Sequence, residues 1–232
     1  MKIIVFDTGP VITLSVNALL WLLYPLKQKF KGRFLITPNV QRELIETPLK
    51  GKKYKFEALK VQDMLNEKIF EIIDNKQIRE KAKQLMQLAN SCFHVKGTYL
   101  KIVHEAEIES LAAAIFLNAD VLVVDERTTR SLIEDPESLE KLLEHKMGKD
   151  VVVDKENLER FKKEVKDVKV IRSVELVTIA YKMGLLNKYV TANKKVNVKM
   201  KNMLLYSALW ALKLYGCAVS GKEIDEIVRL ER

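Results

Sequence analysis

The sequence predicts an α/β fold in which a mostly parallel sheet is covered by helices on both faces, a three-layer α/β/α arrangement. Short, continuous apolar runs at residues 3–6, 34–36 and 121–124 are typical of strands that are buried on both faces. Helical periodicity fills the segments between them, and strands that alternate with helices form parallel sheets. With 232 residues, 48% of them hydrophobic and 31% charged, the chain can build such a core and has a typical globular composition.

The first half of the chain begins with the strand at 3–6, which stops at Asp7-Thr8-Gly9-Pro10. Pro10 favours the first turn of a helix, which is predicted to run to about residue 23. After the strand at 34–36, Thr37-Pro38 opens a helix predicted to reach about residue 46. The remaining pattern predicts helices at 55–67 and 78–89, a strand at 69–73 and a loop at 90–102.

In the second half, an alanine-rich helix at 103–117 precedes the strand at 121–124, which ends at Asp125-Glu126. A helix follows, and then come a strand at 151–153, a charged helix at 155–166 and a strand at 168–171. Ser173 is predicted to cap a helix that Gly184 terminates. A long helix at 200–215 leads to the last helix, where Ser220 and Glu223 form a capping box.

The charge balance favours a polyanionic partner. Lys and Arg total 40 against 31 Asp and Glu, which gives a net charge of +9. A composition rich in Lys and Glu is also typical of thermophilic proteins, so charge alone is a weak indication of nucleic-acid binding. Residues 8–26 carry no charge, but they are too polar and too broken by proline for a membrane span. Cys92 and Cys217 have no CxxC partner, and we expect two reduced thiols in a cytoplasmic protein.

Two acids directly follow predicted strands, at the edge of a parallel sheet where functional clefts form. Asp7 follows the strand at 3–6, and Asp125 follows the strand at 121–124. Carboxylates are the ligands that Mg²⁺ and Mn²⁺ prefer, and grouped acids repel one another without a cation. The alternative for each is an N-cap of the helix that follows. We favour metal binding for both, and interpret the nearby hydroxyls of Thr8 and Thr128 as helix caps.

Further acids lie on two predicted helices, and a helical wheel of about 100° per residue places them. In the helix at 39–46, Glu43 borders the apolar stripe while Glu46 points well outside it. In the helix at 103–117, Glu105 and Glu107 fall on either side of the core direction, and Glu109 faces further away. The wheel selects Glu43 but does not separate Glu105 from Glu107. All three acids of the second helix also suit an acidic first turn.

These segments together resemble the PIN-domain nuclease superfamily. The resemblance is carried by Ile3-Ile4-Val5-Phe6-Asp7-Thr8, by Pro38-Asn39-Val40-Gln41-Arg42-Glu43, and by the block from Glu105 to Ala114 that leads to Asp125-Glu126. Residues 170–186 and 207–229 resemble an archaeal and bacterial subgroup related to VapC-type toxins. Phe6-Asp7-Thr8-Gly9 is also superficially similar to haloacid dehalogenase phosphatases, but Gly9 stands where that chemistry needs a second Asp.

The resemblance implies a PIN-like fold with added helices and a metal-dependent ribonuclease activity. It implies Asp7, Glu43, Glu107 and Asp125 as the acids that hold Mg²⁺ or Mn²⁺, with Glu107 chosen by its spacing from Asp125. It implies RNA, single-stranded or structured, as substrate, and leaves open a homodimer and a protein antitoxin or inhibitor. The alternative is a non-catalytic PIN-like module that binds RNA or a partner. We predict one domain at 1–190, with insertions near 50–100 and 136–166, and a helical extension at 191–232.

Three basic stretches are candidates for contacts with a nucleic-acid backbone. Tyr54 and Phe56 interleave with the second stretch and could stack on bases, although Phe56 could equally belong to the core. The stretches are Lys27, Lys29, Lys31 and Arg33; Lys50, Lys52, Lys53 and Lys55; and Lys194, Lys195, Lys199 and Lys201.

Overall fold

The framework of the fold is a parallel sheet of five strands, in the order β3-β2-β1-β6-β8. The computed structural model describes residues 2–192, 195–196 and 198–231. The strands are β1 (Ile3–Phe6), β2 (Arg33–Ile36), β3 (Phe70–Ile72), β6 (Val121–Val123) and β8 (Val170–Ile171). The predicted α/β class and the predicted parallel sheet are confirmed.

The strands divide the interior into two cores because successive side chains point to opposite faces of the sheet. Ile4 and Phe6 of β1 enter one core, whereas Val5 enters the other. On the first face the Phe6 ring lies 5.1 Å from the Phe34 ring and 5.2 Å from the Phe70 ring, centroid to centroid. Both faces of the sheet are therefore buried, as the continuous apolar runs predicted.

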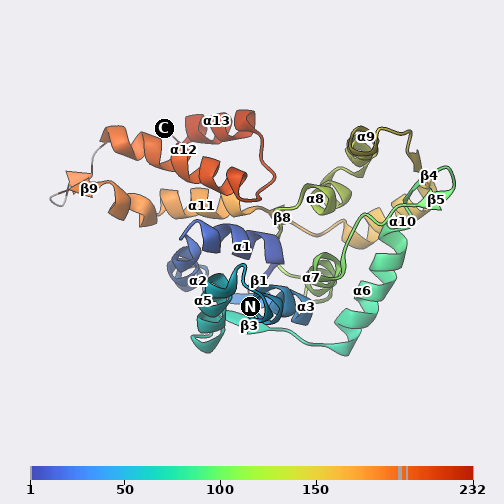
Figure 1. Cartoon of the computed structure of the whole chain (residues 1–232), viewed down its shortest axis with the longest axis horizontal. Helices are drawn as coiled ribbons and strands as arrows, with labels where there is room; N and C mark the ends of the chain where they lie inside the picture. The colour runs from blue at the N-terminus through green and yellow to red at the C-terminus, as the bar shows by residue number, and fades with distance from the viewer. Residues whose placement is uncertain (1, 193–194, 197, 232) are drawn as a thin grey trace.

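Helices cover each face and confirm the three-layer arrangement (Figure 1). The first core is completed by α1 (Thr8–Val16), α2 (Leu23–Phe30), α3 (Pro38–Gln41) with the π-helical turn η2 (Arg42–Glu46), α5 (Lys55–Asn66), α11 (Ser173–Lys182), α12 (Val198–Leu214) and α13 (Gly221–Leu230). The second core is completed by α6 (Lys76–Ala89), α7 (Glu105–Phe116), α8 (Arg127–Glu134), α9 (Pro136–Met147) and α10 (Lys155–Val165). The short elements are η1 (Leu20–Leu22), α4 (Thr47–Lys50), η3 (Leu185–Tyr189), β9 (Thr191–Ala192) and β10 (Lys195–Val196).

The helix predicted from residue 10 to about 23 is wrong in its second half. Helix α1 ends at Val16, Ala18 adopts a positive φ of 55°, and η1 then leads into α2. The bend allows Leu19, Leu20, Leu22 and Leu23 all to be buried, which one straight helix with a single buried face would not allow.

The loop predicted at 90–102 is also wrong, because the segment contains a β-hairpin. Strands β4 (Phe93–Val95) and β5 (Thr98–Tyr99) pair antiparallel, and β7 (Val152–Val153) pairs with the other edge of β4. Lys96 and Gly97 join them with φ of 49° and 80°, the two positive values that a tight hairpin turn of this kind requires. Lysine in the first turn position hides this signal from sequence inspection, because asparagine or aspartate is usual there.

Leucines of η1, α2 and α12 pack in the core. Leu22, Leu23, Leu205, Leu209 and Leu212 are all buried. Cys92 and Cys217 are buried and free. Within the described ranges no single helix is long and apolar enough to cross a membrane, and only α1 together with residues 20–30, bent by 115°, reaches that length and composition jointly.

Candidate active site

Asp7 and Asp125 leave neighbouring strands at the carboxyl edge of the sheet. β1 pairs with β2 on one side and with β6 on the other, so the two acids flank a point where the chain connections diverge. The Asp7 N–H donates to the carbonyl of Val123 at 3.0 Å. A Cβ placed on Gly9 would lie 3.7 Å from Asp7 Oδ2 and 3.5 Å from the Asp125 Cβ, so both acids lie against the same glycine.

Asp7 is a buried carboxyl group with an unpartnered oxygen. It is 4% exposed, its Oδ2 accepts a long hydrogen bond of 3.4 Å from the Gly9 N–H, and its Oδ1 has no hydrogen-bond partner within the described part of the chain. Burial, and then the negative charge of Glu107, raise the pKa of Asp7 to about 7; hydrogen bonds from the backbone of Thr8 and Gly9 oppose the rise, and Glu43 adds to it. The weak cap of α1 therefore leaves a buried acceptor whose negative charge a proton or a cation could neutralise.

Glu43 is held beside Asp7 by the hydroxyl of Thr8, the residue that follows Asp7. Thr8 Oγ1 donates to Glu43 Oε2 at 2.7 Å, so Thr8 orients a carboxylate. The prediction that the Thr8 hydroxyl caps the helix is wrong. Glu43 belongs to the π-helical turn η2, where one extra residue widens the helix, and such turns are frequent at functional sites. Glu43 and Glu46 of this turn are both exposed, and Glu43 is the one that bonds to Thr8.

The three glutamates of α7 have three different environments. Glu105 is exposed and pairs with Arg42 at 3.2 Å. Glu109 is 3% exposed, and its Oε2 accepts from the Asn39 N–H at 2.9 Å, which satisfies the amino end of α3. The expectation that Glu109 faces away from the core is wrong, because α3 covers that face of α7.

Glu107 is the one of these three acids whose charge raises the pKa of Asp7. Its Oε2 accepts from the His104 N–H at 3.0 Å, which fixes its position in the first turn of α7. Burial, together with the charge of Glu126, raises the pKa of Glu107 itself. Asp7, Glu43 and Glu107 thus form one electrostatically coupled group.

Asp125 is anchored by another helix. It is 1% exposed, its Oδ1 accepts from the Ser173 N–H at 2.7 Å, and its Oδ2 accepts from Ser173 Oγ at 2.8 Å. Asp125 therefore caps α11, and the prediction that Ser173 itself caps this helix is wrong. The helix after Asp125 is capped by Glu126, whose Oε2 accepts from the Thr129 N–H at 2.6 Å.

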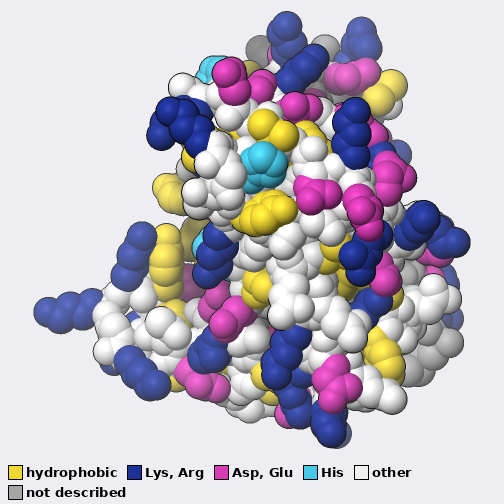
Figure 2. Space-filling view, turned by 90° about the vertical axis from the view of Figure 1, so that its right-hand side faces the viewer, with side chains coloured by type: hydrophobic (Ala, Val, Ile, Leu, Met, Phe, Trp, Pro, Cys, Tyr) yellow, Lys and Arg dark blue, Asp and Glu magenta, His cyan; other side chains and the backbone are white. Residues whose placement is uncertain are grey.

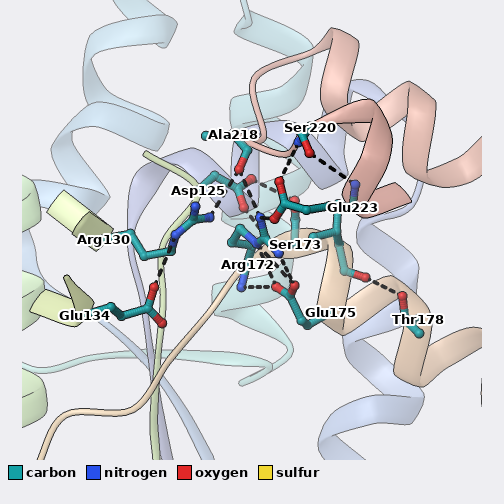
Figure 3. A network of polar contacts seen from close by, with 11 residues as sticks. Asp125, Arg130, Glu134, Arg172, Ser173, Glu175, Thr178, Ala218, Ser220 and Glu223 are labelled. Carbon is teal, nitrogen blue, oxygen red and sulfur yellow. Dashed lines mark hydrogen bonds and ion pairs between the residues drawn. The ribbon is translucent and has the colours of Figure 1, made fainter. Parts of the chain in front are cut away.

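A polar network ties Asp125 to the C-terminal segment (Figure 3). The carbonyl of Asp125 accepts from the Ala218 N–H at 3.1 Å, and the carbonyl of Ala218 accepts from Arg172 Nη1 at 3.1 Å and Arg130 Nη1 at 3.2 Å. Arg172 also pairs with Glu175 at 2.6 Å and with Glu223 at 2.8 Å. Apart from the Arg172–Glu175 pair, which spans three residues, these contacts join residues that are 46–93 positions apart, so no local pattern could reveal them.

Removal of the Arg172 side chain should destabilise the fold more at neutral than at acidic pH. Burial raises the pKa of Glu223, but hydrogen bonds from the Ser220 N–H and the Arg172 guanidinium outweigh it and lower the pKa to about 2. The stability that the ionised Glu223 contributes is therefore present above pH 4.5, its ordinary pKa, and is lost as the pH falls toward 2. We expect Arg172→Ala to lower the free energy of unfolding by about 1–3 kcal/mol at pH 7. Urea unfolding at pH 7 and pH 3 measures this, and an equal loss at both values would contradict the assignment.

The acids have the chemistry of a site for a hard cation but are not arranged as a finished one. Carboxylate oxygens suit Mg²⁺ and Mn²⁺, and Asp7 Oδ1 offers an unused buried acceptor. Over residues 2–192, 195–196 and 198–231, no group of three or more His, Cys, Asp or Glu side chains is placed closely enough to hold a metal ion. Asp7, Glu43 and Glu107 are the acids that could hold a divalent cation, and both oxygens of Asp125 are already engaged by Ser173.

Two residues of the first basic stretch, Lys27 and Arg33, are engaged within the protein. Lys27 Nζ donates to the carbonyls of Lys68 and Ile69 at 2.6 and 2.9 Å, and Arg33 pairs with Glu71 at 2.8 Å. Figure 2 shows acidic and basic side chains interspersed over the face at the right of Figure 1. On that face the positive net charge is not gathered into one patch.

The second basic stretch lies beside an exposed aromatic ring, and the third lies partly outside the described residues. Phe56 beside the second stretch is 66% exposed, so its core interpretation is wrong. In the third stretch Lys194 lies outside the described residues, as do the side chains of Lys195 and Lys199. Lys201 Nζ lies 5.7 Å from the centroid of the Tyr181 ring.

No curated protein and no solved structure was found to match this chain. A family model described as a PIN domain matches residues 3–137, which is more than half of the chain. The matched range contains β1 to α8 and all four acids proposed from the sequence. The parallel sheet and the flanking helices of the chain agree with that match. The chain belongs to the PIN-domain nuclease superfamily.

Proposed function

We propose that this protein is a metal-dependent ribonuclease that hydrolyses internal phosphodiester bonds of RNA with Mg²⁺ or Mn²⁺. The observation that carries the proposal is the buried Asp7 carboxyl, with one unpartnered oxygen and a pKa raised to about 7, next to Glu107 and Glu43. A protein gains no stability from such a group of acids unless a cation or a proton neutralises it. The membership of the PIN superfamily supports nuclease chemistry.

Each acid has a distinct role in this proposal. Asp7, once ionised, is the central ligand, while Thr8 holds Glu43 and the His104 N–H holds Glu107 toward it. Asp125, fixed by Ser173, completes the negative rim through its remaining lone pairs. A bound divalent cation would supply an activated water and neutralise charge on the phosphate and the departing oxygen. Below pH 7 a proton on Asp7 competes with the cation, so activity should fall with acidification.

The second candidate is a non-catalytic module that binds RNA or a protein partner. One observation favours it: each oxygen of Asp125 already accepts a hydrogen bond from Ser173, which is a structural role. This candidate predicts RNA affinity that does not depend on Asp7. The preference for RNA and the cytoplasmic location rest on the resemblance and on the basic composition with two free cysteines. A second copy or a protein inhibitor could contact the exposed Met203, Tyr206 and Leu214 of α12.

The proposal is tested by degradation of labelled RNA and single-stranded DNA with Mn²⁺ or Mg²⁺, with and without chelator. We expect metal-dependent cleavage of RNA by the wild type, and loss of cleavage in Glu43→Gln and Glu107→Gln. Glu46→Gln and Glu105→Gln are matched controls, because these exposed acids lie on the same two helical segments. Cleavage that persists in the first pair of variants, or is lost equally in the control pair, would contradict this site.

A further inference from the structure

A cleft of ≈ 490 Å³ opens beside Glu107 on the outer side of the proposed site. Glu107, Glu126 and Thr128 line it at the edge of the sheet. The opposite wall comes from two segments that are distant in sequence: residues 100–102, which follow the hairpin β4–β5, and the last turn of α9. The cleft is therefore continuous with the acids through Glu107.

The rim of this cleft is basic although its inner end is acidic. Lys101 and Lys146 are both exposed lining residues, and neither forms an ion pair or hydrogen bond within the part of the chain that the structure describes. Other lysines are engaged, as Lys81 is with Glu164 and Lys162 is with Glu137 and Glu159. Lys101 and Lys146 thus hold two positive charges without an ion-pair partner among the described residues, in the same cleft as Glu107 and Glu126.

Apolar side chains lie between these charges. Leu100, Ile102, Leu143 and Met147 line the same cleft, and Met147 is 40% exposed. An unpaired nucleotide presents both a phosphate and an apolar base face, whereas a duplex presents mainly phosphates outside and keeps its bases stacked within. Cations that alternate with apolar surface therefore fit a single strand better than a duplex.

We propose that this cleft is the path of the substrate, in which Lys101 and Lys146 bind phosphates of single-stranded RNA next to the bond at the carboxylate group. The assignment rests on the proposed function and specifies its substrate as unpaired RNA. Both lysines are positioning residues, since they contact the strand outside the reacting phosphate. Their removal should weaken binding and raise KM more than it lowers kcat.

The test compares Lys101→Ala/Lys146→Ala with a control that loses the same charge elsewhere, Lys163→Ala/Lys222→Ala. Lys163 and Lys222 are exposed on α10 and α13, without an ion pair in the described ranges. Binding of a fluorescein-labelled single-stranded RNA 12-mer and of a blunt RNA duplex is measured in chelator, from low to moderate KCl. We expect the cleft variant to bind the single strand at least about tenfold more weakly than the control variant does. The slope of log K against log[KCl] should become shallower by about 1.4, because each lost phosphate contact removes about 0.7.

The outcomes separate this inference from the ribonuclease proposal. Equal affinity and equal salt slope for the cleft and control variants, with RNA cleavage intact, would overturn the substrate path and leave the ribonuclease standing. Selective loss of RNA binding in the cleft variant, with no RNA cleavage by the wild type, would support RNA binding in this cleft and overturn the ribonuclease proposal. Tighter binding of the duplex than of the single strand would overturn the assignment to unpaired RNA.

Discussion

Asp7→Asn should make the metal-free protein more stable at pH 8, by about 2–4 kcal/mol, while RNA cleavage falls to background. The pKa of Asp7 rises from 3.8 to about 7 on folding, so the folded state binds the extra proton between these values. The stability contributed by this group is complete below pH 3.8 and is lost as the pH rises to 7. Above pH 7 the wild type carries a buried charge, which the neutral asparagine removes.

Urea unfolding in chelator measures this effect from pH 4 to pH 8. The stability advantage of Asp7→Asn should be largest at pH 8 and should shrink steadily toward pH 4. Glu46→Gln serves as the control, because Glu46 is exposed and its charge does not act on the pKa of Asp7. A variant less stable than the wild type at pH 8 would show that Asp7 serves mainly as the cap of α1.

Asp125→Asn should have the opposite effect on stability and lower the free energy of unfolding by about 2–3 kcal/mol at pH 8. Both Asp125 oxygens accept hydrogen bonds from the amino end of α11, where a negative charge also interacts well with the helix dipole. Asparagine retains a single acceptor oxygen, so either the N–H or the hydroxyl of Ser173 loses its partner. The two Asp→Asn variants therefore separate an acid with an unpartnered oxygen, Asp7, from an acid with both oxygens hydrogen-bonded, Asp125.

Ser173→Ala is the companion variant for Asp125. It removes only the hydroxyl donor and leaves the backbone donor in place, so we expect a loss of about 1 kcal/mol. Thermal unfolding of the wild type and both variants in the same buffer gives the comparison. Asp125→Asn with wild-type stability would contradict the anchoring role, as would a Ser173→Ala variant that is less stable than Asp125→Asn.

The sequence predicted the sheet well because its signal is local. Continuous apolar runs identify strands buried on both faces, and an acid directly after such a strand lies at the carboxyl edge of the sheet, as Asp7 does. Glu43 was distinguished from Glu46 by helical periodicity alone, and Glu43 is the one that contacts Thr8.

What the sequence missed depends on contacts between distant segments. Glu109 was predicted to face away from the core, but α3 covers it. A helical wheel contains no information about which other helix packs on a given face. The hydrogen bonds between Asp125 and Ser173 join residues that are 48 positions apart. The turn of the hairpin β4–β5 contains Lys96 and Gly97, without the asparagine or aspartate that usually indicates such a turn. The cleft with Lys101 and Lys146 joins a loop to the end of α9, and only the fold brings these two segments together.

The most direct test of the central claim is the affinity of the wild type and of Asp7→Asn for Mn²⁺, measured by calorimetry from pH 5.5 to pH 8.5. The account predicts that wild-type affinity is constant above about pH 7 and falls by about tenfold per pH unit below it, because the cation must displace one proton from Asp7. Asp7→Asn should bind Mn²⁺ much more weakly, with no such pH dependence. Equal affinity in the two proteins, or no binding by the wild type at pH 8.5, would contradict a metal centre built on Asp7.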